Sequence, residues 1–145
     1  MIKKIIIIDY GLGNVKAFLN IYNLLNIPCL LVKNKDDLLK ASKIILPGVG
    51  AFDYAMTLLN DSGLRKSLDF MVQEKKTPVL GICVGMQIMA ESSDEGNMDG
   101  LGWINGKVKK LSSNKYPLPH MGWNNLLMNA DEPIFKNLDL EQSRF

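Results

Sequence analysis

The sequence contains few cysteines and histidines, the residues on which disulfide-bonded domains and many metal sites depend. Its 145 residues include two cysteines, Cys29 and Cys83, and a single histidine, His120. Two cysteines are too few for the disulfide framework of a small secreted domain, and they do not lie in the spacing of metal ligands. We therefore expect two reduced thiols, no metal site and a cytoplasmic protein.

An excess of one charge and a long hydrophobic run are both missing. Seventeen basic and fifteen acidic side chains give a net charge of +2 and are interspersed, which does not indicate a surface for nucleic acid or an anionic membrane. The apolar run from Ile5 to Ile8 ends at Asp9 and is too short for a signal peptide or a membrane span. We expect a small-molecule or protein partner, with neither nucleic acid nor a membrane.

A complete dinucleotide-binding loop is also missing. The segment from Asp9 to Asn14 contains Gly11 and Gly13 after the first predicted strand, but Lys16 stands where the third glycine is needed. An acidic residue that would bind a ribose does not follow the second predicted strand. The sequence therefore predicts no nucleotide cofactor, and we expect no other cofactor.

Apolar runs alternate with amphipathic stretches along the chain, and its length allows one ordinary core. Strands are predicted over residues 3–8, 29–32, 43–46 and 78–82, and helices over 15–25, 51–59, 64–73 and 84–91. The strands are continuous apolar runs, typical of parallel strands buried on both faces. Residues 104–111 and 123–128 are predicted as antiparallel additions. We expect one α/β domain over 1–145, a doubly wound and mostly parallel sheet with helices on both faces.

Cys83 lies between a predicted buried strand and a predicted helix, with Gly81 and Gly85 on either side. This is the thiol form of the nucleophile elbow, a strained turn that projects a nucleophile from the carboxyl edge of a sheet. The start of a helix also favours a thiolate. We predict that Cys83 is a nucleophile. The alternative for Cys83 is a buried cysteine flanked by packing glycines. Cys29 lies within an apolar strand without a glycine turn, and we interpret it as a core residue.

Gln87 follows Cys83 by four residues, so the two side chains would share one face of the predicted helix. Because its neighbours are apolar, we interpret its amide as a group that binds a polar substrate rather than as a solvated position.

A second glycine-rich loop follows the third predicted strand and should lie beside Cys83 at the same sheet edge. An acyl-transfer site needs N–H donors aimed at the oxyanion, commonly from the residue after the nucleophile and from a neighbouring strand loop. The candidates are Val84 and the loop residues Gly48, Val49 and Gly50. Taken alone, this loop is equally consistent with an ordinary strand-to-helix turn.

These two motifs, Gly81 to Gln87 and Pro47 to Phe52, resemble the class I (triad) glutamine amidotransferases. Three further segments are similar to the glutaminase subunits of imidazole glycerol phosphate synthase. They are Asp9 to Asn14, Gly100 to Gly106 and Pro119 to Asn124. The resemblance covers the whole chain in the order of the family.

The resemblance implies that Cys83 attacks the side-chain amide of glutamine and that Gln87 helps to bind this substrate. It further implies that ammonia passes to a (β/α)₈-barrel cyclase subunit that makes imidazole glycerol phosphate, in histidine biosynthesis. Asn14, Trp123 and Asn124 match family positions near the face of that partner. Similar glutaminases serve sugar-modifying synthases, and this alternative stays open.

The chain departs from the family in one respect. The catalytic His-x-Glu segment of the family lies beyond the matched region, and the sequence ends at Phe145. His120 belongs to a different motif, and we interpret it as a structural or interface residue, not as the general base. We expect a domain that is C-terminally incomplete, truncated before the His-x-Glu segment. As 145 residues it would be a catalytically inactive binding module, since losing triad members removes most activity.

Overall fold

The computed structural model describes residues 4–112, 117–127, 133–139 and 142–144. It divides into two compact units, Met1–Lys110 and Leu111–Phe145. The expectation of a single domain over residues 1–145 stays a prediction.

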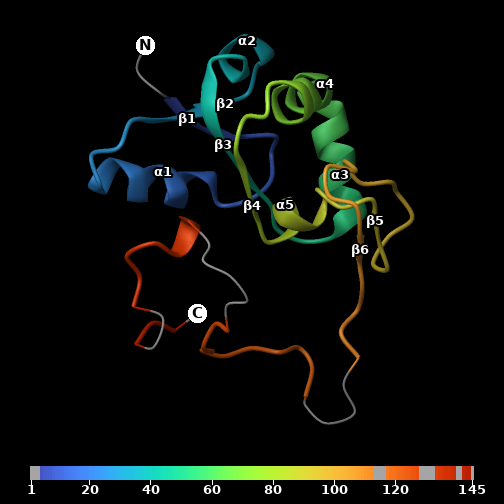
Figure 1. The fold of residues 1–145 in the computed structure, drawn as a ribbon. Coiled ribbons are helices and arrows are strands. Elements are labelled where there is room, and N and C mark those ends of the chain that lie inside the picture. The colour runs from blue at the N-terminus through green and yellow to red at the C-terminus, as the bar shows by residue number, and fades with distance from the viewer. Residues whose placement is uncertain (1–3, 113–116, 128–132, 140–141, 145) are drawn as a thin grey trace. The chain divides into compact units, whose positions relative to one another are not determined.

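A parallel sheet of four strands forms the centre of the first unit (Figure 1). The strands are β1 (Lys4–Ile8), β2 (Cys29–Val32), β3 (Ala41–Pro47) and β4 (Val79–Ile82), in the spatial order β2-β1-β3-β4. In the central strand β1, Ile7 lies opposite Leu31 of β2 and Ile45 of β3. The strand order reverses between β1 and β3, and α/β sheets bind ligands beyond the carboxyl ends of strands at such a point.

Both faces of this sheet are buried, because successive strand residues point to opposite sides. On one side the sheet packs against α3 (Phe52–Asp61) and α4 (Arg65–Asp69), and on the other against α1 (Val15–Leu24). Ile6 and Ile8 belong to the first core, whereas Ile7, Ile45 and Cys29 belong to the second. The predicted parallel, doubly wound arrangement is therefore confirmed, and so is the interpretation of Cys29 as a core residue.

Several short elements differ from the predictions. The predicted helix 64–73 consists of α4 followed by a π-helical turn, η1 (Phe70–Glu74). The predicted helix 84–91 ends early, as α5 (Val84–Gln87). The sequence reading missed α2 (Lys35–Leu38), which begins where the Asn34 side chain accepts a hydrogen bond from the Asp37 N–H at 3.0 Å.

The prediction of antiparallel additions is wrong for the described residues. Within 104–111 the structure contains only β6 (Lys107–Val108), which pairs in parallel with β5 (Ser92–Ser93). Residues 123–127 form no strand, and Met128 lies outside the described residues. The second unit instead contains a short 3₁₀ turn, η2 (Pro133–Phe135). Alternation of apolar and polar residues does not specify the direction of strand pairing, which explains this error.

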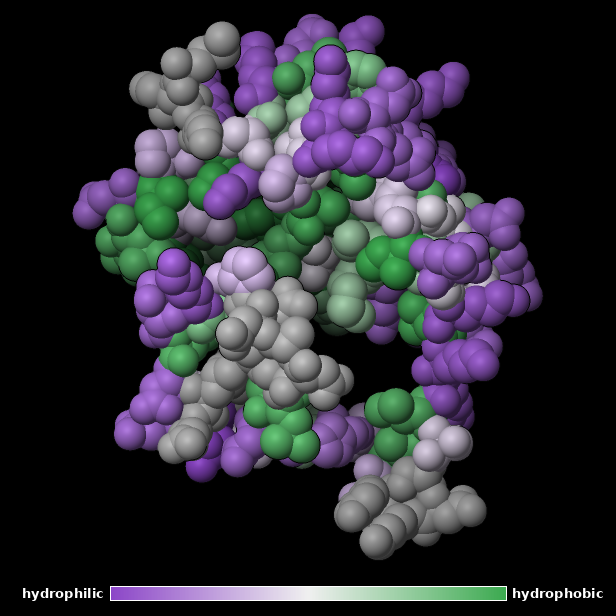
Figure 2. Space-filling model, viewed as in Figure 1, coloured by the Kyte–Doolittle hydropathy of each residue, from purple (hydrophilic) through white to green (hydrophobic). Residues whose placement is uncertain are grey.

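The surface of the first unit carries both polar and hydrophobic residues (Figure 2). Ile21, Leu24 and Leu25, in and just after α1, are exposed hydrophobic residues. Among the described residues, none of the helices has the length and apolar character needed to cross a bilayer. The cytoplasmic location stays a prediction.

We expect Ile7→Ala to lower the free energy of unfolding by about 2–5 kcal/mol, because the fully buried side chain would leave a cavity in the central strand. Leu30→Ala, in the neighbouring edge strand, is the control, since 46% of Leu30 is exposed. Its cost should be about 1 kcal/mol or less. Urea denaturation of both variants checks this, and equal losses would contradict the described burial.

Candidate functional site

Cys83 occupies a sharp turn between the end of β4 and the start of α5. Its backbone has φ 55° and ψ −125°, and its side chain is exposed. A non-glycine residue with such a backbone carries strain of about 1–3 kcal/mol, which persists only when the surrounding structure enforces it. The strand, turn and helix expected around a nucleophile elbow are thus all present.

The loop after β3 lies directly against the start of α5. A Cβ on Gly48 would collide with the backbone of Val84 and Gly85, and a Cβ on Gly85 would collide with the carbonyl of Leu46. Only glycines allow two backbones to approach so closely. The structure therefore brings the predicted oxyanion loop beside the residue that follows Cys83.

Within this loop, Gly48 is half-buried and Val49 is 55% exposed. Gly50 has φ +87°, a left-handed backbone that glycine adopts without steric cost. α3 begins at Phe52, directly after this loop. The backbone of the loop is thus held at Gly48 and at α3, with Val49 and Gly50 between these two fixed points.

The loop after β1 joins the same sheet edge through Tyr10. The buried Tyr10 hydroxyl donates a 2.7 Å hydrogen bond to the carbonyl of Pro47, the last residue of β3. Burial raises the pKa of Tyr10 to about 12, so its hydroxyl remains a donor at neutral pH. Carboxyl ends of β1, β3 and β4 therefore meet in one place.

Gln87 lies one helical turn beyond Cys83, and its backbone N–H donates to the Cys83 carbonyl at 3.2 Å. Gln87 lines an open cavity of about 350 Å³. The other lining residues are Ser93, Asp94, Glu95, Val108, Lys109 and Lys110. These six residues could not be identified from the sequence, because they come from two segments that the β5–β6 pairing and a 3.2 Å hydrogen bond from the Lys110 N–H to the Asp94 carboxylate bring together.

The segment from Gly100 to Ile104 supports α5 from its C-terminal side. The N–H groups of Leu101, Gly102 and Trp103 donate to the carbonyls of Ile88, Ala90 and Met89 at 2.7, 3.1 and 2.9 Å. These bonds replace the continuation of the helix. They explain why α5 stops at Gln87 although the apolar spacing predicted a helix to residue 91.

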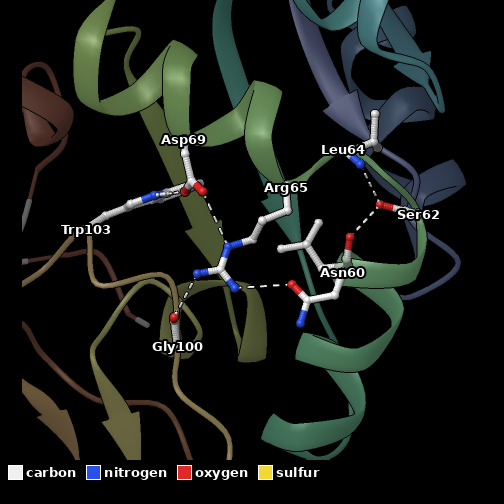
Figure 3. A network of polar contacts seen from close by, with 8 residues as sticks. Asn60, Ser62, Leu64, Arg65, Asp69, Gly100 and Trp103 are labelled. Carbon is white, nitrogen blue, oxygen red and sulfur yellow. Dashed lines mark hydrogen bonds and ion pairs between the residues drawn. The ribbon is translucent and has the colours of Figure 1, made fainter.

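A polar network anchors this supporting segment to α3 and α4 (Figure 3). The Asp69 carboxylate accepts a 2.7 Å hydrogen bond from the Trp103 indole N–H and lies 3.4 Å from the Arg65 guanidinium. Arg65 also donates to the Gly100 carbonyl at 3.1 Å and to the Asn60 side chain at 3.2 Å. The position of α5 thus depends on residues far from Cys83 in the sequence.

The three predicted interface residues occupy different settings. Asn14 is exposed and caps α1, where its side chain accepts from the Ala17 N–H at 3.3 Å. Trp123, in the second unit, is 81% exposed. The Asn124 side-chain nitrogen lies 3.2 Å from the His120 ring nitrogen Nε2, so these two side chains contact each other. These residues belong to two separate units, Asn14 to one and the other two to the other.

The described residues contain no group of three or more histidine, cysteine or acidic side chains arranged to hold a metal ion. The site rests on a thiol, backbone N–H groups and amide and charged side chains. Such a set is suited to nucleophilic attack on an acyl carbon.

Comparison with known proteins agrees with this chemistry. The family described as "Glutamine amidotransferase class-I" matches residues 6–144. The chain is 50% identical to "Imidazole glycerol phosphate synthase subunit HisH" of Bdellovibrio bacteriovorus over 139 residues. This match covers 93% of the chain and 68% of that protein. The HisH subunit of Leptospira interrogans is 48% identical over 92% of the chain and 67% of its own length. The chain spans about two thirds of these relatives.

The fold also matches a solved structure described as "Crystal structure of glutamine amidotransferase". The TM-score is 0.60 at 19% identity, over 72% of the chain and 55% of that structure. This similarity shows the fold alone.

We expect Tyr10→Phe to lower the free energy of unfolding by about 1 kcal/mol at neutral pH, because the hydrogen bond to Pro47 is lost. The pKa of Tyr10 is about 12, above its ordinary value of 10.0, so folding favours the protonated hydroxyl. This stabilisation is complete below pH 10 and is lost as the pH rises toward 12. The stability difference between wild type and Tyr10→Phe should therefore shrink over this range in urea denaturation. A constant difference would contradict the assignment.

Proposed function

The chain belongs to the class I glutamine amidotransferase family and, within it, to the HisH subunits of imidazole glycerol phosphate synthase, and we propose that it hydrolyses glutamine through Cys83. The observation that carries this proposal is the exposed Cys83 thiol, held at positive φ between β4 and α5. The names of the relatives favour service to imidazole glycerol phosphate synthase over service to a sugar-modifying synthase.

In the proposed reaction the Cys83 thiolate attacks the side-chain amide carbon of glutamine. Val84 lies in the first turn of α5, where N–H groups have no partner within the helix, and the loop Gly48 to Gly50 lies beside it. Donors from both segments would stabilise the oxyanion. The proton that the Cys83 thiol loses is delivered to the amide nitrogen, which leaves as ammonia as the C–N bond breaks, and water then hydrolyses the γ-glutamyl thioester to glutamate and regenerates the thiol.

The cavity beside Gln87 suits the amino-acid end of glutamine. It carries two carboxylates, Asp94 and Glu95, and two ammonium groups, Lys109 and Lys110. Opposite charges at one end of the site would pair with the α-ammonium and α-carboxylate groups of the substrate. The Gln87 amide, between these charges and Cys83 along the chain, would hydrogen-bond the substrate's polar groups.

The sequence contains one histidine, His120, and we assign it no role as a base. The His-x-Glu segment expected from the family resemblance has no counterpart among the 145 residues. Without a base, Cys83 would keep the elbow and the oxyanion donors but turn over slowly. The inactivity of these residues on their own stays a prediction.

We further propose that the ammonia acceptor is a (β/α)₈-barrel cyclase subunit that makes imidazole glycerol phosphate. The relatives are named as subunits of the synthase of that compound, which supports a partner of this kind. Trp123 is the strongest interface candidate, because exposed tryptophans frequently dominate binding energy once they are buried by a partner. Asn14 and Asn124 are the additional candidates.

We expect a glutamine analogue with an electrophilic diazoketone in place of the side-chain amide to alkylate Cys83 once per chain. Cys83→Ala should lose this labelling. Cys29→Ala, the matched control, should keep it, because Cys29 is buried and burial raises the pKa of its thiol. Mass spectrometry of the labelled peptides checks the site. Labelling at Cys29 would contradict the proposal.

The same variants should be assayed for glutamate release in complex with the barrel subunit. The 145-residue chain is compared with a chain extended through any downstream His-x-Glu. We expect turnover in the extended chain, its loss in Cys83→Ala, and labelling without rapid turnover in the 145 residues. Glutaminase activity that survives Cys83→Ala would overturn the mechanism.

We expect Trp123→Ala to raise the dissociation constant for the barrel subunit about tenfold or more, because a buried aromatic anchor would be removed. Leu138→Ala is the control, since it removes an exposed apolar side chain from the same unit. Isothermal titration calorimetry measures both. Equal dissociation constants for the two variants would show that Trp123 does not lie in the interface.

A further inference from the structure

The helix that follows the predicted oxyanion loop has no N-cap of its own. Ala51 occupies the cap position of α3 and makes no side-chain hydrogen bond there. The first N–H of the helix, that of Phe52, instead donates to the Glu95 carboxylate at 3.1 Å. A side chain 43 residues away thus supplies the cap that serine, threonine, asparagine or aspartate usually provides locally.

A second carboxylate makes the reverse connection. Asp53, in the first turn of α3, accepts hydrogen bonds from the N–H groups of Asn97 and Met98 at 2.9 and 3.0 Å. Gly96 lies so close that a Cβ there would collide with the Asp53 carboxylate. We refer to Asp53 and Glu95 together as the carboxylate clasp. It joins the loop 95–98 to the start of α3 from both sides.

The clasp connects the two parts of the proposed site. Glu95 lines the cavity that Gln87 also lines, whereas Phe52 follows Gly50 of the oxyanion loop by two residues. The oxyanion loop is held by glycine contacts at Gly48, but its other end is set by where α3 begins. Movement of the loop 95–98 would therefore change both the cavity wall and the oxyanion loop.

We propose that Asp53 is a positioning residue for glutamine hydrolysis: by fixing the loop 95–98 it keeps Glu95 on the Phe52 N–H and so sets the oxyanion loop beside Val84. This inference rests on the proposed function, since it needs Cys83 as the nucleophile. Both carboxylate oxygens of Asp53 accept hydrogen bonds from backbone N–H groups of this loop. It therefore acts through Glu95 and the loop and is not a catalytic residue.

The test separates two reactions of the same thiol in a chain extended through any downstream His-x-Glu and bound to the proposed barrel subunit. Hydrolysis of glutamine passes through an oxyanion, whereas alkylation of Cys83 by iodoacetamide is a direct displacement that needs no oxyanion donors. Asp53→Asn replaces one acceptor oxygen by a donor and breaks one of the two bonds to the loop. We expect kcat to fall about tenfold or more, because small misplacement of catalytic groups is costly, while the alkylation rate stays within about twofold of wild type.

Gly96→Ala disturbs the clasp from the loop, because the added Cβ would collide with the Asp53 carboxylate. It should likewise lower kcat and leave the alkylation rate of Cys83 nearly unchanged. Asp61→Asn, at the exposed far end of α3, is the matched control and should leave both rates unchanged. Two outcomes would overturn the inference: a kcat for Asp53→Asn equal to that of Asp61→Asn, or a parallel fall in hydrolysis and alkylation, which indicates general disruption. Failure of the proposed function itself would be seen separately, as hydrolysis that persists in Cys83→Ala.

Discussion

The close contact between the end of β3 and the start of α5 is the constraint on which the rest of the site depends. Gly48 and Gly85 allow these two backbones to touch, and a side chain at either position would force them apart. The contact presses the loop after β3 against Val84 and leaves Cys83 at the turn with a strained backbone. The strained backbone of Cys83 persists because the packing around the turn enforces it.

Because α5 has only four residues, it does not have enough internal hydrogen bonds to hold its own position. It is fixed on one side by the Gly48 contact and on the other by the hydrogen bonds from Leu101 to Trp103. Asp69 and Arg65 in turn hold that supporting segment. The proposed nucleophile is thus positioned by three segments distant from one another in the sequence, which suits a group whose reactivity depends on its geometry.

The cavity beside Gln87 is likewise formed by segments that are distant from one another in the sequence. Charged side chains from the segments around β5 and β6 meet there, and Glu95 serves both as a wall and as the cap of α3. A substrate that binds in this cavity would lie beside Glu95, which also accepts the Phe52 N–H just after the proposed oxyanion loop. Substrate binding and preparation of the acyl-transfer site would then share one physical connection.

The parallel sheet and the glycine-flanked turn at Cys83 can be predicted from the sequence. Continuous apolar runs are typical of parallel strands, so β2 lies at its predicted bounds, and the bounds of β3 and β4 differ from the predicted ones by one or two residues. Glycines on both sides of Cys83 permit a tight turn, which is a local signal, although the close contact that needs Gly85 is made with the distant Leu46. The length of α5, the parallel pairing of β5 with β6, and the contacts of Asp53 and Glu95 depend on the tertiary structure. Each of these depends on hydrogen bonds between residues that are far apart in the sequence, and local periodicity carries no information about such partners.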